Sequence, residues 1–513
     1  MKRFTLSLVL LAGLAACSDS NFVSADEADG AYHGDSGYGE AGGDDDDDTD
    51  IGSEDESDFF SLAPAPTPTF VFIANPERDT VTRVTVPDLE VITAEVGNHP
   101  DLVEVTPDYS MGVTFNSGSD DVSIIESMTL EETRVDVREN LDAMEMSPDG
   151  GWVVLYNSLA LPDDNTSGAT STKEVSFIEL TTATHSALAM GFQPRDVLFT
   201  EAGDKAVFLG DAWLGVVELD GELSVDLVQI ADDLLDPPAS EECILSPDGD
   251  FALLRQKDAD QLVLVDLITL EVSRIEVGDT PTDLDITPDG SEAIAVARGS
   301  GELWIYDFQD PTAEPTVLSL PAGETLGSVV FGPEGAPALL YSTASGRSRF
   351  VSWDRATDEF TVRPLPKPVA SVGMDPTGGT ALFLHADTDA DDMDPGYEGH
   401  FGLSMVDLSD FLSNDYILPA PPSGFAHSDD GLNGFLILEE HKALQVLDYG
   451  RLLVDEKELR SDPVHVGTLP TTTWAYVNQE HELGRLSFYD IQTDTLKTMT
   501  GFELNAGIEI EEN

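Results

Sequence analysis

Short apolar segments alternate with polar turns along most of this chain. One phrase recurs between them: an apolar segment, then Ser or Thr, Pro, Asp and Gly, then another apolar segment. It lies at positions 105–108, 146–150, 245–249 and 286–290, with looser copies at 332–335 and 375–378. In such a turn Pro presets φ at the first corner and Gly accepts the exit conformation. The phrase therefore predicts β-hairpins, and no helical periodicity of any length follows the first residues.

The copies repeat with a period of roughly 40 to 50 residues and several short strands per period, which is the pattern of a β-propeller. About nine full units follow from the turns near positions 107, 148, 201, 247, 288, 333, 376, 429 and 470. Three further strands open the chain at Phe70–Asn75, Thr80–Val86 and Glu90–Val96, and a single strand, Gly507–Ile510, ends it. We expect these fragments to form a tenth unit, with the C-terminal strand closing the ring. The prediction is an all-β propeller of about ten four-stranded blades, and two smaller propellers are the alternative.

An acidic residue ends the third strand of most units, where its side chain is expected to cap the following turn. These acids are Glu126, Glu179, Glu218, Asp266, Asp307, Asp354, Asp407, Asp448 and Asp490. The clearest unit combines Leu262–Asp266 with the phrase Val277–Pro281. Its wording resembles the YVTN family of β-propeller repeats, bacterial and archaeal cell-surface relatives of WD40-like propellers. The resemblance covers nearly all of residues 70–513, and it implies a propeller domain there without implying any catalytic residue.

The N-terminus has the pattern of an export signal. Two basic residues precede the apolar run Leu6–Ala16, which is too short to span a bilayer. Leu14–Cys17 reads Leu-Ala-Ala-Cys and resembles the lipobox of bacterial lipoproteins. The resemblance implies that residues 1–16 are a signal peptide and that Cys17 is the lipidated first residue of an extracytoplasmic protein. Ser18 after the cysteine favours the outer membrane or cell surface of a Gram-negative bacterium; an ordinary signal with a chance cysteine is the alternative.

Residues 17–69 are predicted to form a linker. From Ser18 to Leu62 the chain has no basic residue and few large apolar ones, and it contains the run Asp44–Asp48. Such a segment buries too little apolar surface to fold, so we expect a disordered tether, with a weakly chelating acidic brush as the alternative. Ala63–Thr69 is rich in Pro and is expected to be a stiff spacer ending at the first strand, which starts at Phe70.

The formal net charge is −75, from 99 acidic and 24 basic side chains. Nucleic acid and anionic membrane surfaces are therefore poor partners, and the lipid anchor is the only expected membrane contact, whereas cations and basic surfaces are plausible partners. Adaptation to a saline habitat would explain the same charge. Besides Cys17 the chain has one cysteine, Cys243, which we expect to be buried in a strand.

Two units have enlarged loops between their second and third strands, at Leu161–Lys173 and Ala386–Phe401. Both must lie on the same face of a propeller, and a spacing of five units places them on opposite sides of a ten-bladed ring. Long loops on a rigid scaffold are where binding usually occurs.

The second loop carries the sharpest candidate site. Asp387, Asp389, Asp391 and Glu398 have the spacing of ligands 1, 3, 5 and 12 in an EF-hand calcium loop. The sixth position of an EF-hand loop is normally Gly because the chain turns sharply there, but this loop has Asp392 at that position, and no helices flank it. We expect an EF-hand-like calcium site, with a merely solvated acidic loop as the alternative. His385 and His400 flank the loop, but hard oxygen ligands dominate it and favour calcium over a transition metal; no other cofactor is expected.

A second candidate site lies on the first strand of several units, which lines the channel of a propeller. Glu104, Glu145, Asp285 and Glu509 each lie between two apolar residues in a similar register. They predict a partial ring of carboxylates; contact with water between apolar neighbours is the simpler reading.

Nucleophilic catalysis finds little support, because no Gly-x-Ser-x-Gly elbow is present and the nine histidines follow no pattern. We therefore expect a non-enzymatic, lipid-anchored propeller of the cell envelope that binds a protein or glycan partner. Two alternatives remain. One is a propeller enzyme of the lactonase or cyclase type with a metal at the channel. The other is an outer-membrane assembly factor.

Overall fold

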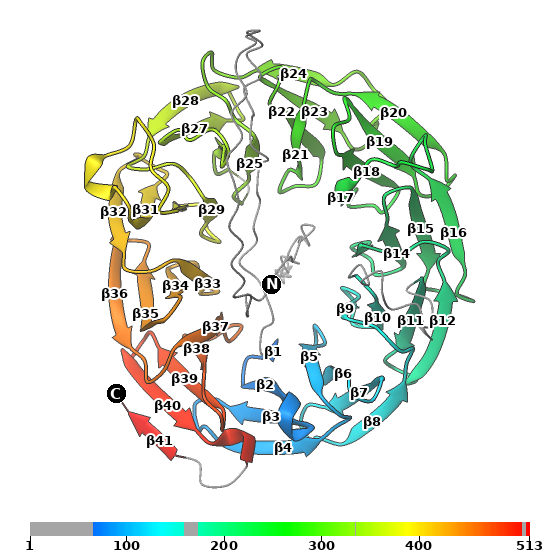
Figure 1. Cartoon of the computed structure of the whole chain (residues 1–513), viewed down its shortest axis with the longest axis vertical. Coiled ribbons are helices and arrows are strands. Elements are labelled where there is room, and N and C mark those ends of the chain that lie inside the picture. The colour runs from blue at the N-terminus through cyan, green and yellow to red at the C-terminus, as the bar shows by residue number, and fades with distance from the viewer. Residues whose placement is uncertain (1–64, 159–172, 334, 505–508, 513) are drawn as a thin grey trace, which may run out of the picture.

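The fold is a single ring of ten antiparallel sheets around a central opening (Figure 1). The structure is a computed structural model that describes residues 65–158, 173–333, 335–504 and 509–512. Each sheet is formed by consecutive strands, so each is one blade of a propeller. The predicted all-β propeller is confirmed, and it is one ring rather than two. We number the blades 1 to 10 in chain order.

The strands of each blade run outward from the opening in chain order. The innermost strands are β1 (Ala65–Pro66), β5 (Pro100–Val105), β9 (Ala143–Met146), β13 (Asp196–Phe199), β17 (Ser240–Leu245), β21 (Pro281–Ile286), β25 (Ser328–Val330), β29 (Ser371–Met374), β33 (Pro422–His427) and β37 (Pro463–Thr468). The second strands are β2 (Phe70–Asn75), β6 (Met111–Asn116), β10 (Trp152–Tyr156), β14 (Lys205–Leu209), β18 (Phe251–Gln256), β22 (Glu292–Ala297), β26 (Ala338–Tyr341), β30 (Thr380–His385), β34 (Asn433–Leu438) and β38 (Trp474–Gln479).

The third and fourth strands complete the blades. The third strands are β3 (Thr80–Thr85), β7 (Asp121–Glu126), β11 (Glu174–Glu179), β15 (Trp213–Glu218), β19 (Gln261–Asp266), β23 (Glu302–Asp307), β27 (Arg349–Asp354), β31 (Phe401–Asp407), β35 (His441–Asp448) and β39 (Arg485–Asp490). The outermost are β4 (Val91–Glu95), β8 (Glu132–Asp136), β12 (Thr184–Ala189), β16 (Val225–Gln229), β20 (Val272–Glu276), β24 (Thr316–Ser319), β28 (Glu359–Pro364), β32 (Ser413–Leu418), β36 (Leu453–Glu458) and β40 (Thr495–Thr500). Three short 3-10 helices, η1 (Pro76–Arg78), η2 (Pro395–Tyr397) and η3 (Phe502–Leu504), lie in loops.

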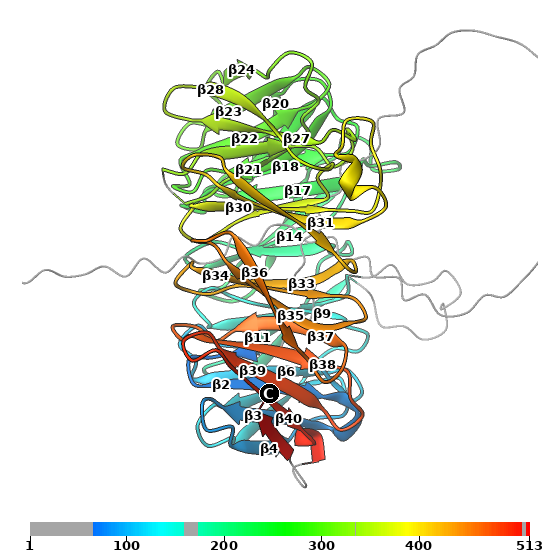
Figure 2. The ribbon, with the colours of Figure 1, turned by 90° about the vertical axis from the view of Figure 1, so that its left-hand side faces the viewer.

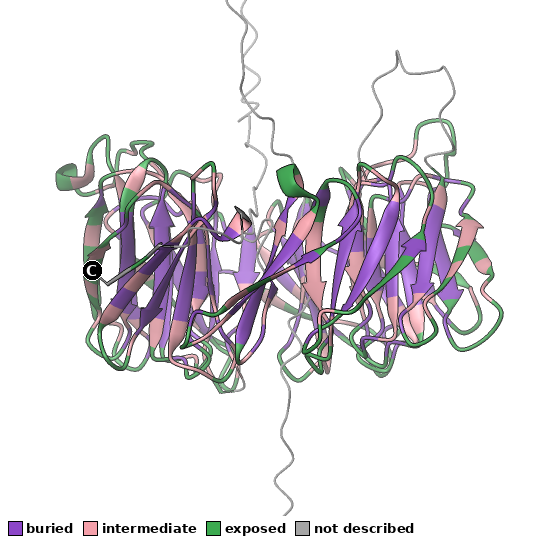
Figure 3. Ribbon diagram, turned by 90° about the horizontal axis from the view of Figure 1, so that it is seen from below, coloured by how far each residue is buried: buried purple, intermediate pink, exposed green. Residues whose placement is uncertain are grey.

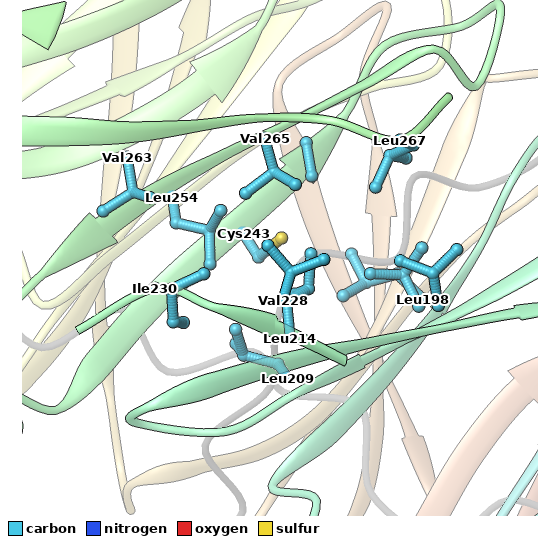
Figure 4. Packing of buried hydrophobic residues seen from close by; sticks show 13 residues of the cluster. Leu198, Leu209, Leu214, Val228, Ile230, Cys243, Leu254, Val263, Val265 and Leu267 are labelled. Carbon is cyan, nitrogen blue, oxygen red and sulfur yellow. The ribbon is translucent and has the colours of Figure 1, made fainter. Parts of the chain in front are cut away.

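The core lies between neighbouring blades, which stand face to face around the ring (Figures 2 and 3). The second and third strands are buried on both faces and read as continuous apolar runs, whereas the outermost strands are largely exposed. One cluster joins blades 4 and 5 and includes Leu214, Val228, Cys243 and Leu254 (Figure 4). Burial of each such side chain contributes about 1.5–3 kcal/mol to the free energy of folding. Because these side chains pack between blades, each blade is stabilised mainly by its two neighbours.

The recurring turn is held by a side-chain hydrogen bond. In blade 6 the Thr287 hydroxyl donates to Asp289 at 2.7 Å, and in blade 3 the Ser147 hydroxyl donates to Asp149 at 2.6 Å. The predicted caps at the ends of the third strands are also present: Asp266 accepts from the Ile268 and Thr269 amides at 2.9 and 2.7 Å. These hydrogen bonds lower the pKa of Asp266, although burial opposes them.

The ring is not closed in the predicted way. The C-terminal strand β41 (Glu509–Glu512) pairs with β40, so it is a fifth, outermost strand of blade 10 and does not complete blade 1. The innermost strand of blade 1 is β1, which lies inside the segment expected to be a proline-rich spacer. The ring closes instead by side-chain packing, in a cluster that joins Val71 and Val84 of blade 1 to Phe488 and Phe502 of blade 10.

Some predicted segments lie outside the described residues: the signal at 1–16, Cys17, the tether up to residue 64, and positions 159–172 of the first large loop. The strands that flank that loop, β10 and β11, belong to blade 3, five blades from the second loop in blade 8. Within the described ranges, no helix has the length and apolar character needed to span a bilayer.

Candidate functional site: an anchored acidic loop and the channel carboxylates

The enlarged loop of blade 8 connects β30 to β31 and is built around a lysine. Lys367 is fully buried, and its ammonium donates to the His400 carbonyl at 2.7 Å. The same ammonium lies 3.6 Å from Asp389 Oδ1, which also accepts from the Gly399 amide at 2.9 Å. The buried charge therefore ties the beginning of the loop to its end.

A second set of contacts fastens the loop to blade 7. Asp392 accepts from the Ser348 amide at 3.1 Å and pairs with Arg349 at 3.2 Å. The Asp394 amide donates to the Pro366 carbonyl at 2.7 Å, and its side chain caps η2 by accepting from the Gly396 amide at 2.8 Å. These contacts hold the loop against blade 7 and against the connection that contains Pro366 and Lys367, and η2 projects at the edge of one face of the ring (Figure 2).

The predicted calcium ligands are not gathered into one group. Asp387, Asp391 and Glu398 are exposed, while Asp389 is engaged by Lys367. Among the described residues, no three His, Cys, Asp or Glu side chains lie together in a way that could hold a metal ion. The buried Lys367 ammonium contacts one of the four predicted ligands, Asp389, and the calcium site stays a prediction.

His385, which flanks the loop, has a structural role. It is buried, and its ring contacts the Pro368 carbonyl at 2.8 Å and the Ser404 hydroxyl at 2.9 Å. Burial lowers the pKa of His385 to about 4, so the ring is neutral at pH 7. Corresponding pairs between the second and third strands of other blades are Asn75–Thr82, Asn116–Ser123 and Gln479–Ser487. The Ser–His contact is therefore one version of a repeated structural hydrogen bond.

Three of the four predicted channel carboxylates, Glu104, Glu145 and Asp285, lie on the innermost strands β5, β9 and β21, along the right and top of the opening in Figure 1. Burial, and then the charge of Glu145, raise the pKa of Glu104 to about 8. Burial and Asp196 raise the pKa of Glu145 to about 7. Burial and Glu242 likewise raise the pKa of Asp285 to about 7, against a lowering hydrogen bond from the Ile286 amide.

The structure therefore forms an arc of carboxylates over five consecutive blades, 2 to 6. Asp196 and Glu242 belong to this arc and were missed, because they lie two positions earlier in their strands than the predicted residues. Residues two positions apart in a strand point to the same face, and this rule would have identified Asp196 and Glu242 from the sequence. Glu509 does not belong to the arc, because β41 lies at the outer rim. Glu242 is already paired with Arg255 at 2.6 Å, so one end of the arc is neutralised.

Cys243 is buried as predicted, in the cluster between blades 4 and 5. Burial raises the pKa of its thiol, so it is protonated at neutral pH and contributes as a small apolar side chain.

The class that this geometry defines is a ten-bladed β-propeller with a fastened acidic loop on one face. No protein-family model matches the chain, and no curated protein matches it. Among solved structures, it is similar to one described as the eukaryotic initiation factor, with a TM-score of 0.52 and 8% identity over 77% of this chain and 97% of that one. At that identity the likeness shows the fold alone.

Two further solved structures are more distant. The dihydro-heme d1 dehydrogenase NirN in complex with DHE has a TM-score of 0.45 and 16% identity over 69% of this chain and 74% of that one. Apo AztD from Citrobacter koseri has a TM-score of 0.41 and 15% identity over 68% of this chain and 94% of that one. Both matched structures are of propeller type.

Proposed function

We propose that this protein is a non-enzymatic binding scaffold of the cell envelope, held by a lipid at Cys17, and that the acidic loop at residues 386–400 docks a basic patch on a protein or glycan partner. The observation that carries the proposal is the set of internal contacts that anchors that loop. Its anchors are internal, at Lys367, Ser348 and Arg349, while Asp387, Asp391 and Glu398 are left exposed.

A loop ordered before binding loses little conformational entropy when a partner arrives, which favours affinity. Exposed carboxylates on the rim of an interface mainly accelerate association and select a basic partner. A net charge of −75 adds a long-range field in the same direction. These three contributions support docking to a basic surface.

The test is affinity capture from envelope extracts of the native host with the full-length chain, at about 20 and 300 mM NaCl. The loop variant combines Asp387→Asn, Asp391→Asn and Glu398→Gln. The matched control removes the same charge from exposed positions around the outer turn of blade 4, by Asp220→Asn, Glu222→Gln and Asp226→Asn.

We expect a partner that the wild type and the control retain at low salt, and that the loop variant loses. Equal loss of the partner by both variants would mean that net charge alone explains the binding. Capture of nothing above background by the wild type would remove the proposal.

The calcium prediction belongs to the same loop and is tested separately by calorimetry. A saturable heat for calcium that Asp389→Asn together with Asp391→Asn abolishes would mean that calcium displaces the Lys367 ammonium from Asp389. An unchanged heat in that double variant would mean that calcium binds to carboxylates other than Asp389 and Asp391.

A further inference from the structure

A hollow of about 580 Å³ lies at the end of blade 7, bordered by turns of blades 6 and 8. Phe331, Pro333, Arg355 and Arg363 contribute from blade 7, and Leu408 and Phe411 from blade 8. Pockets that hold small molecules have volumes of roughly 300–1,000 Å³ and predominantly apolar walls, so the hollow has a suitable size.

The hollow is distinct from the acidic loop. The loop contacts Arg349 at the first residue of β27, whereas Asp354 at the last residue of β27 borders the hollow. Six residues of strand separate the two ends by about 17 Å, so the two features lie on opposite faces of the ring.

The sequence explains why a hollow forms at this blade. In blade 3, Ser147 Oγ accepts from the Trp152 amide at 2.9 Å and ties the recurring turn together. The corresponding residues of blade 7 are Gly332, which has no hydroxyl, and Pro337, which has no amide hydrogen. The turn of blade 7 therefore lacks the amide-to-hydroxyl hydrogen bond that closes the turn of blade 3. The hollow lies beside this open turn.

The two arginines of the hollow differ in their partners. Arg355 forms an ion pair with Glu292, and its guanidinium lies 5.5 Å from the Phe331 ring and 5.7 Å from the Trp353 ring. The Arg363 guanidinium is stacked on Phe411, with Cζ 3.6 Å from the ring centroid. Among the described residues, no carboxylate lies within 4 Å of Arg363 and no atom accepts a hydrogen bond from its buried Nε.

We propose that the hollow is a binding site for a small monocarboxylate with a flat apolar body. The guanidinium of Arg363 receives the carboxylate, because its planar fork matches a carboxylate in two hydrogen bonds. The apolar body lies against Phe331, Pro333 and Leu408. A dianionic phosphate is disfavoured, because Asp289, Asp354 and Glu359 border the same hollow and would repel a second charge.

The test uses benzoate as the probe, with benzamide as its neutral counterpart and inorganic phosphate as a second anion. Each is titrated by calorimetry and ligand-observed NMR into the full-length chain and into Arg363→Gln and Arg363→Lys. Arg451→Gln is the matched control, because Arg451 is an exposed arginine beside an outer turn of blade 9. Thermal unfolding of each variant checks that it is folded.

We expect saturable binding of benzoate by the wild type and by Arg451→Gln, at least about tenfold weaker binding by Arg363→Gln, and an intermediate loss in Arg363→Lys, since a charged hydrogen bond contributes about 1.5–3 kcal/mol. Benzamide and phosphate should not saturate. The proposal is wrong if benzoate does not bind the wild type, if both Arg363 variants bind it as the wild type does, or if phosphate binds more tightly than benzoate. Because Arg363→Lys keeps the charge and most of the side chain, it decides the matter should Arg363→Gln fail to fold. None of these outcomes depends on the acidic loop.

Discussion

Gly290 and Gly301 have nearly the same backbone conformation, with φ of 67° and 66°, but different surroundings. A Cβ added to Gly290 would lie 2.2 Å from Cγ of Pro247, in the turn of the preceding blade. A Cβ added to Gly301 would meet nothing within 4 Å. The first glycine is therefore required by a contact between blades, and the second only by its torsion.

We expect Gly301→Ala to lower the free energy of unfolding by about 1 kcal/mol, the cost of a left-handed conformation in a residue with a Cβ. Gly290→Ala should lower it by about 1–3 kcal/mol more, because the turns of blades 5 and 6 must separate. Urea denaturation of both variants measures the difference, and equal losses would contradict the contact with Pro247.

Local side-chain roles could be predicted from the sequence when both partners are a few residues apart. The acids at the ends of the third strands cap their turns as expected, because Asp266 and Thr269 are neighbours in the chain. Asp389 was predicted as a calcium ligand from the EF-hand spacing of its loop, whereas its contact with Lys367 joins residues that are not local in the sequence. Lys367 lies on the connection between blades 7 and 8, and nothing in the spacing of the loop indicates that a buried ammonium will reach Asp389.

At the scale of elements, the strands within each unit were predictable, and the pairing of the chain ends was not. Phe70–Asn75 is a strand as expected. The short strand β1 was not predicted, because its segment contains Pro64, Pro66 and Pro68 and was interpreted as a spacer. Pro is nevertheless tolerated where a strand has an unpaired edge. The place that the C-terminal strand was predicted to take in blade 1 is occupied by β1, and β41 pairs with β40. A tight turn at Thr67, whose amide donates to the Phe70 carbonyl at 2.8 Å, joins β1 to β2.

The position of β41 leads to a test by truncation. Deletion of residues 509–513 should change the melting temperature by no more than about 2 °C, because an outer strand that covers no core is removed. Phe502→Ala, which removes a fully buried ring between blades 10 and 1, should cost about 3–5 kcal/mol. Differential scanning calorimetry compares the two, and a large loss on truncation would indicate that the C-terminal strand closes the ring after all.

At the scale of the whole molecule, the arc of carboxylates makes stability depend on pH. Glu104, Glu145 and Asp285 have raised pKa values of about 8, 7 and 7 in the fold. Such groups bind protons more tightly in the folded state, so their contribution to stability is complete below about pH 4 and is lost as the pH rises to about 8.

We therefore expect the free energy of unfolding to fall by several kcal/mol between pH 5 and pH 8, since each pH unit below a raised pKa contributes about 1.4 kcal/mol per group. The combined variant Glu104→Gln, Glu145→Gln and Asp285→Asn should flatten that dependence. The control with Asp220, Glu222 and Asp226 neutralised should keep the slope of the wild type. Urea denaturation across this range measures both, and the same slope in both variants would exclude the arc as its source.

The number of blades could be predicted because a recognisable turn marks nearly every unit, whereas the sequence left one ring and two smaller propellers open and the structure shows one ring. The hollow in blade 7 was not predicted, since it arises from a unit that departs from the phrase. In the sequence, the segment that contains Gly332 and Pro337 reads as a weak copy of the turn phrase. The stacking of Arg363 on Phe411 joins residues of different blades, so this contact beside the hollow is visible only in the structure.

The innermost position of β1 has a mechanical consequence. A pull on the chain before Ala65 acts first on a strand of two residues, which within the described part of the chain pairs with β2 at Ala65↔Phe72 and Pro66↔Val71, and Pro66 has no amide hydrogen to donate. Under tension β1 should therefore detach before β2, β3 and β4. A force applied at this end of the protein would remove the smallest element first and load the core strands only afterwards.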